Sequence, residues 1–161
     1  MQTIPTTTLT TTSDVSDVSA WTWQGRTDFD TAAWFGFVYV ITDPDNRHYI
    51  GRKYLHKTVR RKAGKLKVST DWPTYWSSSP DIQRRTAIDT MGWQRRIIAL
   101  APTRGTVNYA EAWLQMKLNV LTNQQFINGI VGVRIGRKAI QRWNDVVWDQ
   151  ELIHDLQNQT S

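Results

Sequence analysis

One aromatic stretch, residues 34–41, constrains the fold of this chain more than any other feature. It reads Trp-Phe-Gly-Phe-Val-Tyr-Val-Ile, and a run of aromatic and β-branched residues is typical of a buried strand. The next residues, 43–46, read Asp-Pro-Asp-Asn and favour a turn. Residues 47–52 then resume an extended pattern. We therefore expect a β-hairpin over residues 35–52, closed by a loop of about four or five residues.

Two helices and one further strand are expected after the hairpin. Ser79 is a good N-cap with proline at the next position, so it predicts a helix over residues 80–91 that ends at Gly92. Residues 93–100 predict a strand, and the spacing of apolar residues predicts a half-buried helix over 109–120. Together these elements predict an α/β (α+β) fold in which a small three-stranded antiparallel sheet is flanked by helices.

Composition divides the chain into three segments. Residues 1–30 are expected to form a disordered tail, because the first 20 residues are rich in Thr, Ser and Asp and lack a periodic apolar pattern. Residues 34–135 are expected to form the folded domain, and residues 136–161 a C-terminal helical extension. Within the domain, residues 53–70 fit a short helix or a mobile loop, and their pattern does not decide between the two.

The residue inventory excludes several classes of protein. The chain has no Cys, so it has neither a disulfide framework nor a thiolate zinc site. Its three His residues do not stand at metal-ligand spacing with carboxylates. No apolar run approaches the length of about 18 residues that a membrane helix needs, and the N-terminus does not resemble a secretion signal. We expect a soluble, cytoplasmic protein.

Positive charge is concentrated in the middle of the chain. The net charge of +6 combines −4 for residues 1–48 (two Arg, six Asp), +14 for residues 49–142 (18 Lys and Arg, four acids) and −4 for the remainder. Such clustering predicts a nucleic-acid partner, although a solvated basic face is the alternative. The expected DNA contacts are Gly51, Arg52, Lys53, His56, Lys57, Lys62, Lys65 and Lys67.

An ordered set of residues carries the functional signal. It consists of Phe37-Val38-Tyr39 and Tyr49-Ile50-Gly51 on the expected hairpin, Arg60 and Arg61 after it, Glu111 in an expected helix, and Asn128 beyond that helix. Taken alone, the two tyrosines are as well explained as core aromatics. As a set, these residues resemble the GIY-YIG nucleases, metal-dependent enzymes that cut DNA phosphodiester bonds. The first half of the motif departs from the family at Gly and Ile, and the arginines stand slightly later than in the family.

A second pattern resembles the phage-encoded members of this family. The chain reads Tyr-Ile-Gly-Arg-Lys over 49–53, Thr-Asp-Trp over 70–72, and Tyr-Trp-Ser-Ser-Ser over 75–79. With these segments the resemblance spans about residues 35–135. It implies a GIY-YIG-like nuclease domain from a bacteriophage, with a role in homing or in the breakdown of foreign DNA.

The resemblance implies a role for each site residue. Tyr39 would be the general base, with a pKa lowered by the metal and nearby cations, and Tyr49 would orient water or phosphate. Arg60 or Arg61 would bind the scissile phosphate. Glu111 would bind Mg²⁺ or Mn²⁺, since acids are scarce around it; its alternative role is a capping box with Asn108 as the N-cap. The catalytic residues that the resemblance implies are therefore Tyr39, Tyr49, Arg60, Arg61, Glu111 and Asn128.

Asn128 is expected to position the groups around the metal, its alternative being a loop residue in the left-handed region before Gly129. The resulting hypothesis is a metal-dependent endonuclease that hydrolyses double-stranded DNA in the host cytoplasm and forms a homodimer to cut both strands. The rival hypothesis is a nucleic-acid-binding protein on the same scaffold without catalysis. A third is a virion or interaction protein, which would show no salt-dependent DNA binding.

Overall fold

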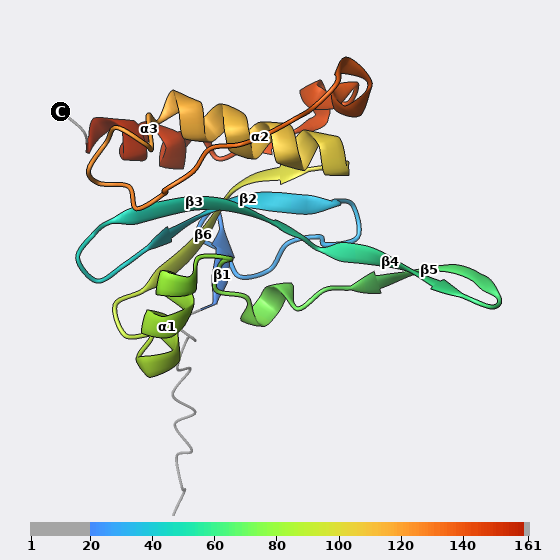
Figure 1. Ribbon diagram of the computed structural model, residues 1–161, viewed down its shortest axis with the longest axis horizontal. Helices are drawn as coiled ribbons and strands as arrows, with labels where there is room; N and C mark the ends of the chain where they lie inside the picture. Colours follow the sequence, from blue (N-terminus) through green and yellow to red (C-terminus); the bar gives the residue numbers. More distant parts are fainter. Residues whose placement is uncertain (1–19, 160–161) are drawn as a thin grey trace, which may run out of the picture.

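The central strand of a mixed sheet organises the molecule. The computed structural model describes residues 20–159. Its strand β2 (Gly36–Thr42) is buried along its whole length and pairs antiparallel with β3 (His48–Tyr54) and β6 (Gln94–Ala101) (Figure 1). The strand β1 (Trp21–Trp23) runs parallel to β6, and β7 (Val147–Trp148) runs antiparallel to it. The sheet is therefore five-stranded and mixed, where the sequence predicted only the antiparallel trio β6-β2-β3.

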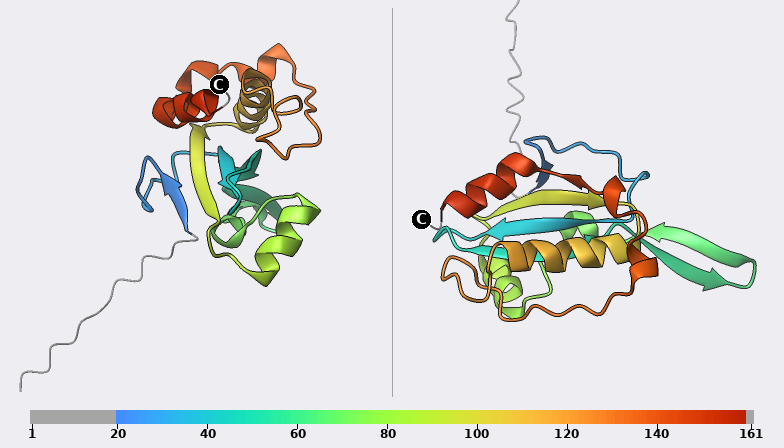
Figure 2. Two further views of the ribbon diagram at one scale, coloured as in Figure 1. Left: turned by 90° about the vertical axis from the view of Figure 1, so that its left-hand side faces the viewer. Right: turned by 90° about the horizontal axis from the view of Figure 1, so that it is seen from above.

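Helices cover both faces of this sheet. The helices α2 (Arg104–Lys117) and α3 (Gln150–Asn158) lie on one face, and α1 (Pro80–Ile88) and the short helix η1 (Trp72–Thr74) lie on the other (Figures 1 and 2). Side chains of β2 alternate between the two resulting cores. Val38 and Val40 belong to the core beneath α2, whereas Phe37, Tyr39 and Ile41 belong to the core on the α1 side.

Residues 53–70 form neither the short helix nor the loop considered from sequence. They continue from β3 into a separate hairpin of β4 (His56–Arg61) and β5 (Gly64–Ser69), which projects from the body of the protein (Figure 1). Gly64 opens β5 with a φ of 120°, a conformation that strongly favours glycine. The basic side chains masked the alternation of Val59, Leu66 and Val68 that marks these strands.

Both ends of the described chain belong to the folded body. The tail expected over 1–30 is wrong for its described part, because Trp21 and Trp23 are buried in β1; residues 1–19 lie outside the described residues. Two indole rings bury enough apolar area to order a three-residue strand. Residues 136–161 are also more than an extension, since their described part adds β7 to the sheet and α3 to the core. Two short helices, η2 (Arg137–Ile140) and η3 (Trp143–Asp145), precede these elements.

The helix carrying Glu111 begins earlier than its apolar pattern predicts. Its N-cap is Thr103, whose side chain and that of Thr106 form a reciprocal capping box. Asn108 therefore lies inside the helix and accepts a hydrogen bond from the Tyr54 hydroxyl at 2.6 Å. The capping role considered for Glu111 is wrong for this reason. Within residues 20–159, no helix is both long and apolar enough to cross a bilayer.

A buried carboxylate fixes the turn between β2 and β3. Asp43 accepts hydrogen bonds from the backbone N–H groups of Asp45 and Arg47, at 3.0 and 2.9 Å. Its second oxygen accepts from Arg47 Nε at 3.1 Å and from Arg85 on α1 at 3.0 Å. Burial favours the neutral acid, but these donors outweigh it and lower the pKa of Asp43. The hairpin is thereby tied to α1.

The Asp43→Asn variant tests this turn. Because the folded-state pKa lies below the unfolded value of about 3.9, ionised Asp43 stabilises the fold above that pH and the contribution is lost as pH falls through the folded-state pKa. We expect Asp43→Asn to lower the free energy of unfolding at pH 7 by about 2 kcal/mol and to weaken its decline below pH 4. Urea unfolding followed by circular dichroism from pH 3 to 7 measures both effects. Asp45→Asn, in the same turn but exposed, is the control; identical pH profiles for wild type and Asp43→Asn would contradict the assignment.

Candidate active site

The two motif tyrosines lie together on the α1 side of the sheet. Tyr39 on β2 stands opposite Gly51, and Tyr49 lies two residues before that glycine on β3. The ring centroids of Tyr39 and Tyr49 are 6.4 Å apart, and Tyr75, which follows η1, lies 6.2 Å from Tyr39. The sequence predicted the pair, and the structure adds Tyr75 to it. The three phenols form one cluster.

The protein's own residues raise the pKa of Tyr39 rather than lower it. Its side chain is 1% exposed, and burial, followed by the neighbouring Tyr75 and Tyr49, raises its pKa well above the ordinary value. Tyr75 and Ser77 also interact with its hydroxyl. The protein's own residues therefore favour the neutral phenol. Tyr49 is only partly buried and is the more accessible phenol of the motif pair.

Gly51 is required by the packing of Tyr39. A β-carbon at this position would lie against the Tyr39 hydroxyl and 2.6 Å from the ring carbon Cζ. Side-chain atoms cannot approach so closely without displacing the ring. The space beside Gly51, which was expected to contact DNA, is thus filled by a tyrosine ring.

Lys53, expected as a DNA contact, connects β3 to the segment that follows β5. Its Nζ lies 2.6 Å from an Asp71 carboxylate oxygen and 3.8 Å from the centroid of the Tyr75 ring. The hydrogen bond from Lys53 lowers the pKa of Asp71. These contacts hold Tyr75 beside the motif tyrosines.

The opposite face of β3 carries an ion pair. Arg52, the residue before Lys53, pairs with Glu111 on α2. The Glu111 side chain is 14% exposed and that of Arg52 is 37% exposed. Burial raises the pKa of Glu111 and outweighs the opposing effect of Arg52. Arg52 was expected to contact DNA, and nothing in the sequence links it to a carboxylate in a distant helix.

Asn128 forms hydrogen bonds with the edge of β3 that faces away from β2, near this ion pair. Its Oδ1 accepts from the Ile50 N–H at 2.9 Å, and its Nδ2 donates to the Ile50 carbonyl at 2.8 Å. Gln115 on α2 donates to the same carbonyl at 3.1 Å. Asn128 has no positive φ, so the left-handed loop conformation considered for it is wrong. The two hydrogen bonds of its amide replace those that a neighbouring strand would make, and they fix the β3 backbone between the tyrosine cluster and Glu111.

The structure does not bring the expected phosphate-binding arginines to this site. Arg60 and Arg61 are exposed on the projecting β4, and no contact within residues 20–159 joins them to Glu111 or to the motif tyrosines. Lys57, Lys62, Lys65 and Lys67 lie on the same hairpin or its turn. His56 stands at its root and contacts the Thr31 carbonyl at 2.8 Å.

Glu111 fits a divalent metal only as a single protein ligand. Among the described residues, no group of three or more His, Cys, Asp or Glu is arranged to hold a metal ion. Mg²⁺ commonly keeps most of its waters and takes one or two carboxylates together with substrate phosphates. A half-buried carboxylate such as Glu111 matches that requirement once Arg52 has moved away.

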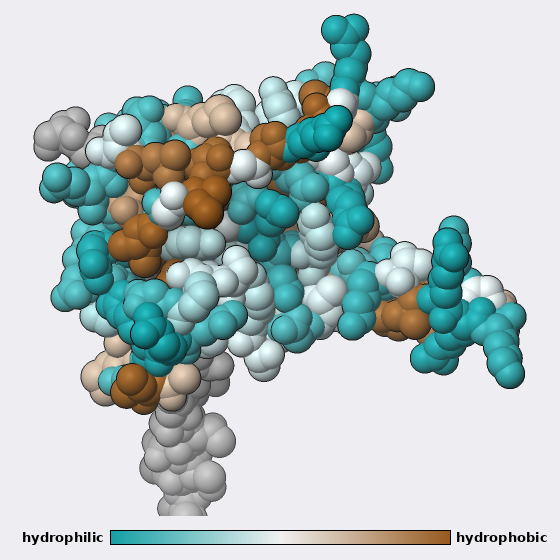
Figure 3. Space-filling view, viewed as in Figure 1, coloured by the Kyte–Doolittle hydropathy of each residue, from teal (hydrophilic) through white to brown (hydrophobic). Residues whose placement is uncertain are grey.

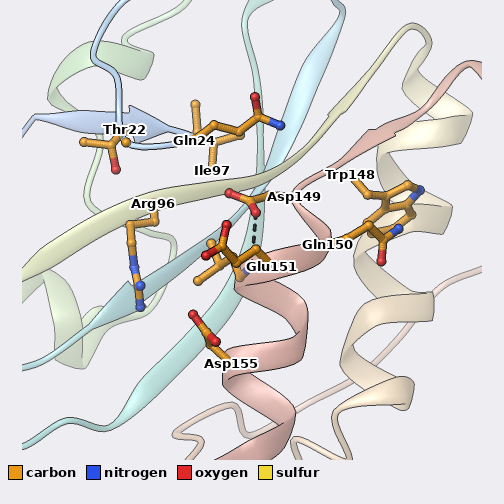
Figure 4. A pocket seen from close by; sticks show the side chains of 11 residues that line it. Thr22, Gln24, Arg96, Ile97, Trp148, Asp149, Gln150, Glu151 and Asp155 are labelled. Carbon is orange, nitrogen blue, oxygen red and sulfur yellow. Dashed lines mark hydrogen bonds between the residues drawn. The ribbon is translucent and has the colours of Figure 1, made fainter.

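A pocket of about 620 Å³ lies at the other edge of the sheet, between β1, β6 and α3 (Figure 4). Its lining places Arg96 among the carboxylates of Asp149, Glu151 and Asp155. Asp149 caps α3 by accepting from the Leu152 N–H at 3.0 Å. Three carboxylates around one arginine repel a polyanion, so this pocket is not the nucleic-acid site.

Paired tyrosines on a β-hairpin and a glutamate on the following long helix define the class of GIY-YIG nucleases. Residues 21–131 match the family model described as "Putative endonuclease segE, GIY-YIG domain". The match covers more than half of the chain, which therefore belongs to this family of endonucleases. It begins at the first residue of β1, earlier than the domain start at residue 34 predicted from sequence. No curated protein and no solved structure matches the chain significantly. GIY-YIG nucleases generally depend on divalent metals.

Replacing Gly51 tests the close packing against Tyr39. We expect Gly51→Ala to lower the free energy of unfolding by about 1–3 kcal/mol, because the new methyl group must displace the buried ring. In a Tyr39→Leu background the clashing hydroxyl and Cζ are absent, so the same substitution has a smaller cost. Urea unfolding of the four proteins of this double-mutant cycle measures the coupling. Additive effects of the two substitutions would show that the ring does not require glycine.

Proposed function

We propose that this protein is a metal-dependent endonuclease that hydrolyses phosphodiester bonds of double-stranded DNA at β3. The half-buried ion pair of Arg52 and Glu111, backed by the tyrosine cluster on the other face of the same strand, is the observation that carries this proposal. Membership of a nuclease family supports it independently. The expected metal is Mg²⁺ or Mn²⁺, held by Glu111.

Phosphodiester hydrolysis needs an activated water, charge neutralisation on the phosphoryl oxygens and a stabilised leaving oxygen. When bound at Glu111, the divalent ion would supply the neutralisation of charge. Tyr49, the accessible phenol, orients water or a phosphate oxygen through its hydroxyl. Tyr39 keeps its proton and holds Tyr49 in place through the ring cluster with Tyr75.

Arg52 has two possible anionic partners, the Glu111 carboxylate and a DNA phosphate. Its planar guanidinium can donate two parallel hydrogen bonds to either. In the free protein it neutralises Glu111. We propose that an incoming phosphate draws Arg52 away, so that phosphate binding and release of the carboxylate occur together. Arg60 and Arg61 then contact DNA elsewhere.

The biological setting follows from the motif pattern. The Tyr-Ile-Gly-Arg-Lys sequence of residues 49–53 supports a phage-encoded nuclease that acts in the host cytoplasm, either in homing or in degradation of foreign DNA. One site per chain supports a homodimer for cutting both strands. The rival function, DNA binding without catalysis, keeps the basic surface and predicts no cleavage.

Removing the Glu111 carboxylate distinguishes the two functions. We expect wild-type protein to nick or linearise supercoiled plasmid in Mg²⁺, EDTA to abolish cleavage, and Glu111→Ala to lower the rate at least about a hundredfold. Glu151→Ala, which removes an exposed carboxylate from α3, is the control and keeps wild-type activity. Gel retardation by wild type without cleavage in either Mg²⁺ or Mn²⁺ would refute the nuclease. Equal cleavage by Glu111→Ala would refute the role of Glu111.

If Arg52 moves from Glu111 to a DNA phosphate, replacing it has opposite effects on metal binding and on cleavage. Without DNA, Arg52→Gln removes the cation that occupies Glu111, so we expect Mn²⁺ to bind about tenfold more tightly. The same variant loses a phosphate ligand and cleaves plasmid more slowly. Electron paramagnetic resonance of free Mn²⁺ measures the affinity, with Glu111→Ala as the blank. Arg84→Gln, which removes an exposed arginine of α1, is the matched control; if both glutamine variants bind Mn²⁺ as wild type does, Arg52 does not compete for the carboxylate.

A further inference from the structure

The β4–β5 hairpin, residues 56–69, extends away from the body of the protein and is called the ribbon below (Figures 1 and 2). Neither of its strands pairs with the five-stranded sheet. A lone two-stranded hairpin is only marginally stable in water. A binding partner that covers one of its faces would therefore order it further.

The composition of the ribbon selects an anionic partner. It contains six cations and no acid, and its surface is mostly hydrophilic (Figure 3). The cations are Lys57, Arg60, Arg61, Lys62, Lys65 and Lys67. None of them takes part in an ion pair in the described part of the chain. This charge is available to phosphates and to acceptor groups of bases.

Strand register separates the ribbon into two faces. Residues opposite one another in an antiparallel pair share a face, and successive residues alternate. The polar face pairs Thr58 with Lys67 and Arg60 with Lys65, and the other face pairs Lys57 with Val68, Val59 with Leu66 and Arg61 with Gly64. One face thus consists of hydrogen-bonding side chains, and the other contains the three apolar residues.

The root of the ribbon is fixed beside the candidate active site. The Thr70 N–H donates to the Leu55 carbonyl at 3.0 Å, and its hydroxyl donates to the Tyr54 carbonyl at 2.6 Å. One residue later, Asp71 pairs with Lys53. The ribbon therefore leaves the body directly after the strand that carries Arg52, and returns directly before the segment that carries Tyr75.

We propose that the ribbon enters the major groove of DNA beside the cleavage site and reads base edges through its polar face. The B-DNA major groove is about 12 Å wide and admits a two-stranded β-ribbon. Arg and Lys donate to guanine O6 and N7, and the Thr methyl group contacts the thymine methyl group. This inference rests on the proposed function, since it takes double-stranded DNA as the substrate. It assigns Thr58, Arg60, Lys65 and Lys67 to sequence preference rather than to catalysis.

Two double variants that each remove two charges from exposed positions test this assignment. Arg60→Ala/Lys65→Ala alters the polar face, and Lys57→Ala/Arg61→Ala alters the other. Interference by guanine N7 methylation reports contacts in the major groove, and cleavage of a randomised duplex library reports base preference. We expect that guanine N7 methylation no longer interferes with DNA binding by the polar-face variant. Its base preference at the contacted positions should fall at least about fivefold. The other variant weakens binding in a salt-dependent manner but keeps the wild-type preference.

The outcomes separate this inference from the proposed function. Wild-type cleavage without base preference or N7 interference, or equal loss of preference in both variants, overturns the role of the ribbon and leaves the nuclease intact. Tighter binding to duplex RNA, whose major groove is too narrow for side chains to read, also overturns it. A wild-type protein that neither binds nor cuts duplex DNA overturns both proposals.

Discussion

The edge position of β3 is the constraint on which the rest of the molecule depends. Its antiparallel pairing with β2 fixes the register, so Tyr49 and Lys53 face the α1 side while Ile50 and Arg52 face α2. Only a strand at the edge can present both faces and an open side to a large substrate. Asn128 closes part of that side by bonding to the backbone of Ile50, which keeps the strand rigid where two sets of polar groups meet.

The elements predicted correctly are those whose side-chain pattern matches their surroundings. The run of residues 34–41 is apolar because both of its faces are buried, and the Asp-rich turn after it closes the hairpin as expected. β1 was missed because its burial depends on two Trp residues that pack against β6 and β2, a long-range effect that composition does not reveal. The ribbon was missed because exposed cations outnumber the apolar residues that alternate with them.

For the site, the sequence identified several of the groups but not their partners. The Tyr39–Tyr49 pair follows from a hairpin with a known turn. The pairing of Arg52 with Glu111 depends on the docking of α2 over β3, and the high pKa of Tyr39 comes first from its burial and then from the neighbouring Tyr75. Both are consequences of tertiary packing, and each changes the chemistry expected of its residue. The resemblance to a family located the site, whereas protonation and pairing required the structure.

Charge is distributed over the fold in a way that orients a polyanion before contact. The cations of the ribbon project on one side, while the carboxylates around Arg96 lie at the opposite edge of the sheet. DNA is attracted toward the first and repelled from the second, and this field acts over about a Debye length of 8–10 Å. In the proposed function, the backbone phosphates then approach β3 from its open edge. In the proposed mechanism, rearrangement of the Arg52–Glu111 pair at that edge is the step that converts electrostatic capture into a reactive site.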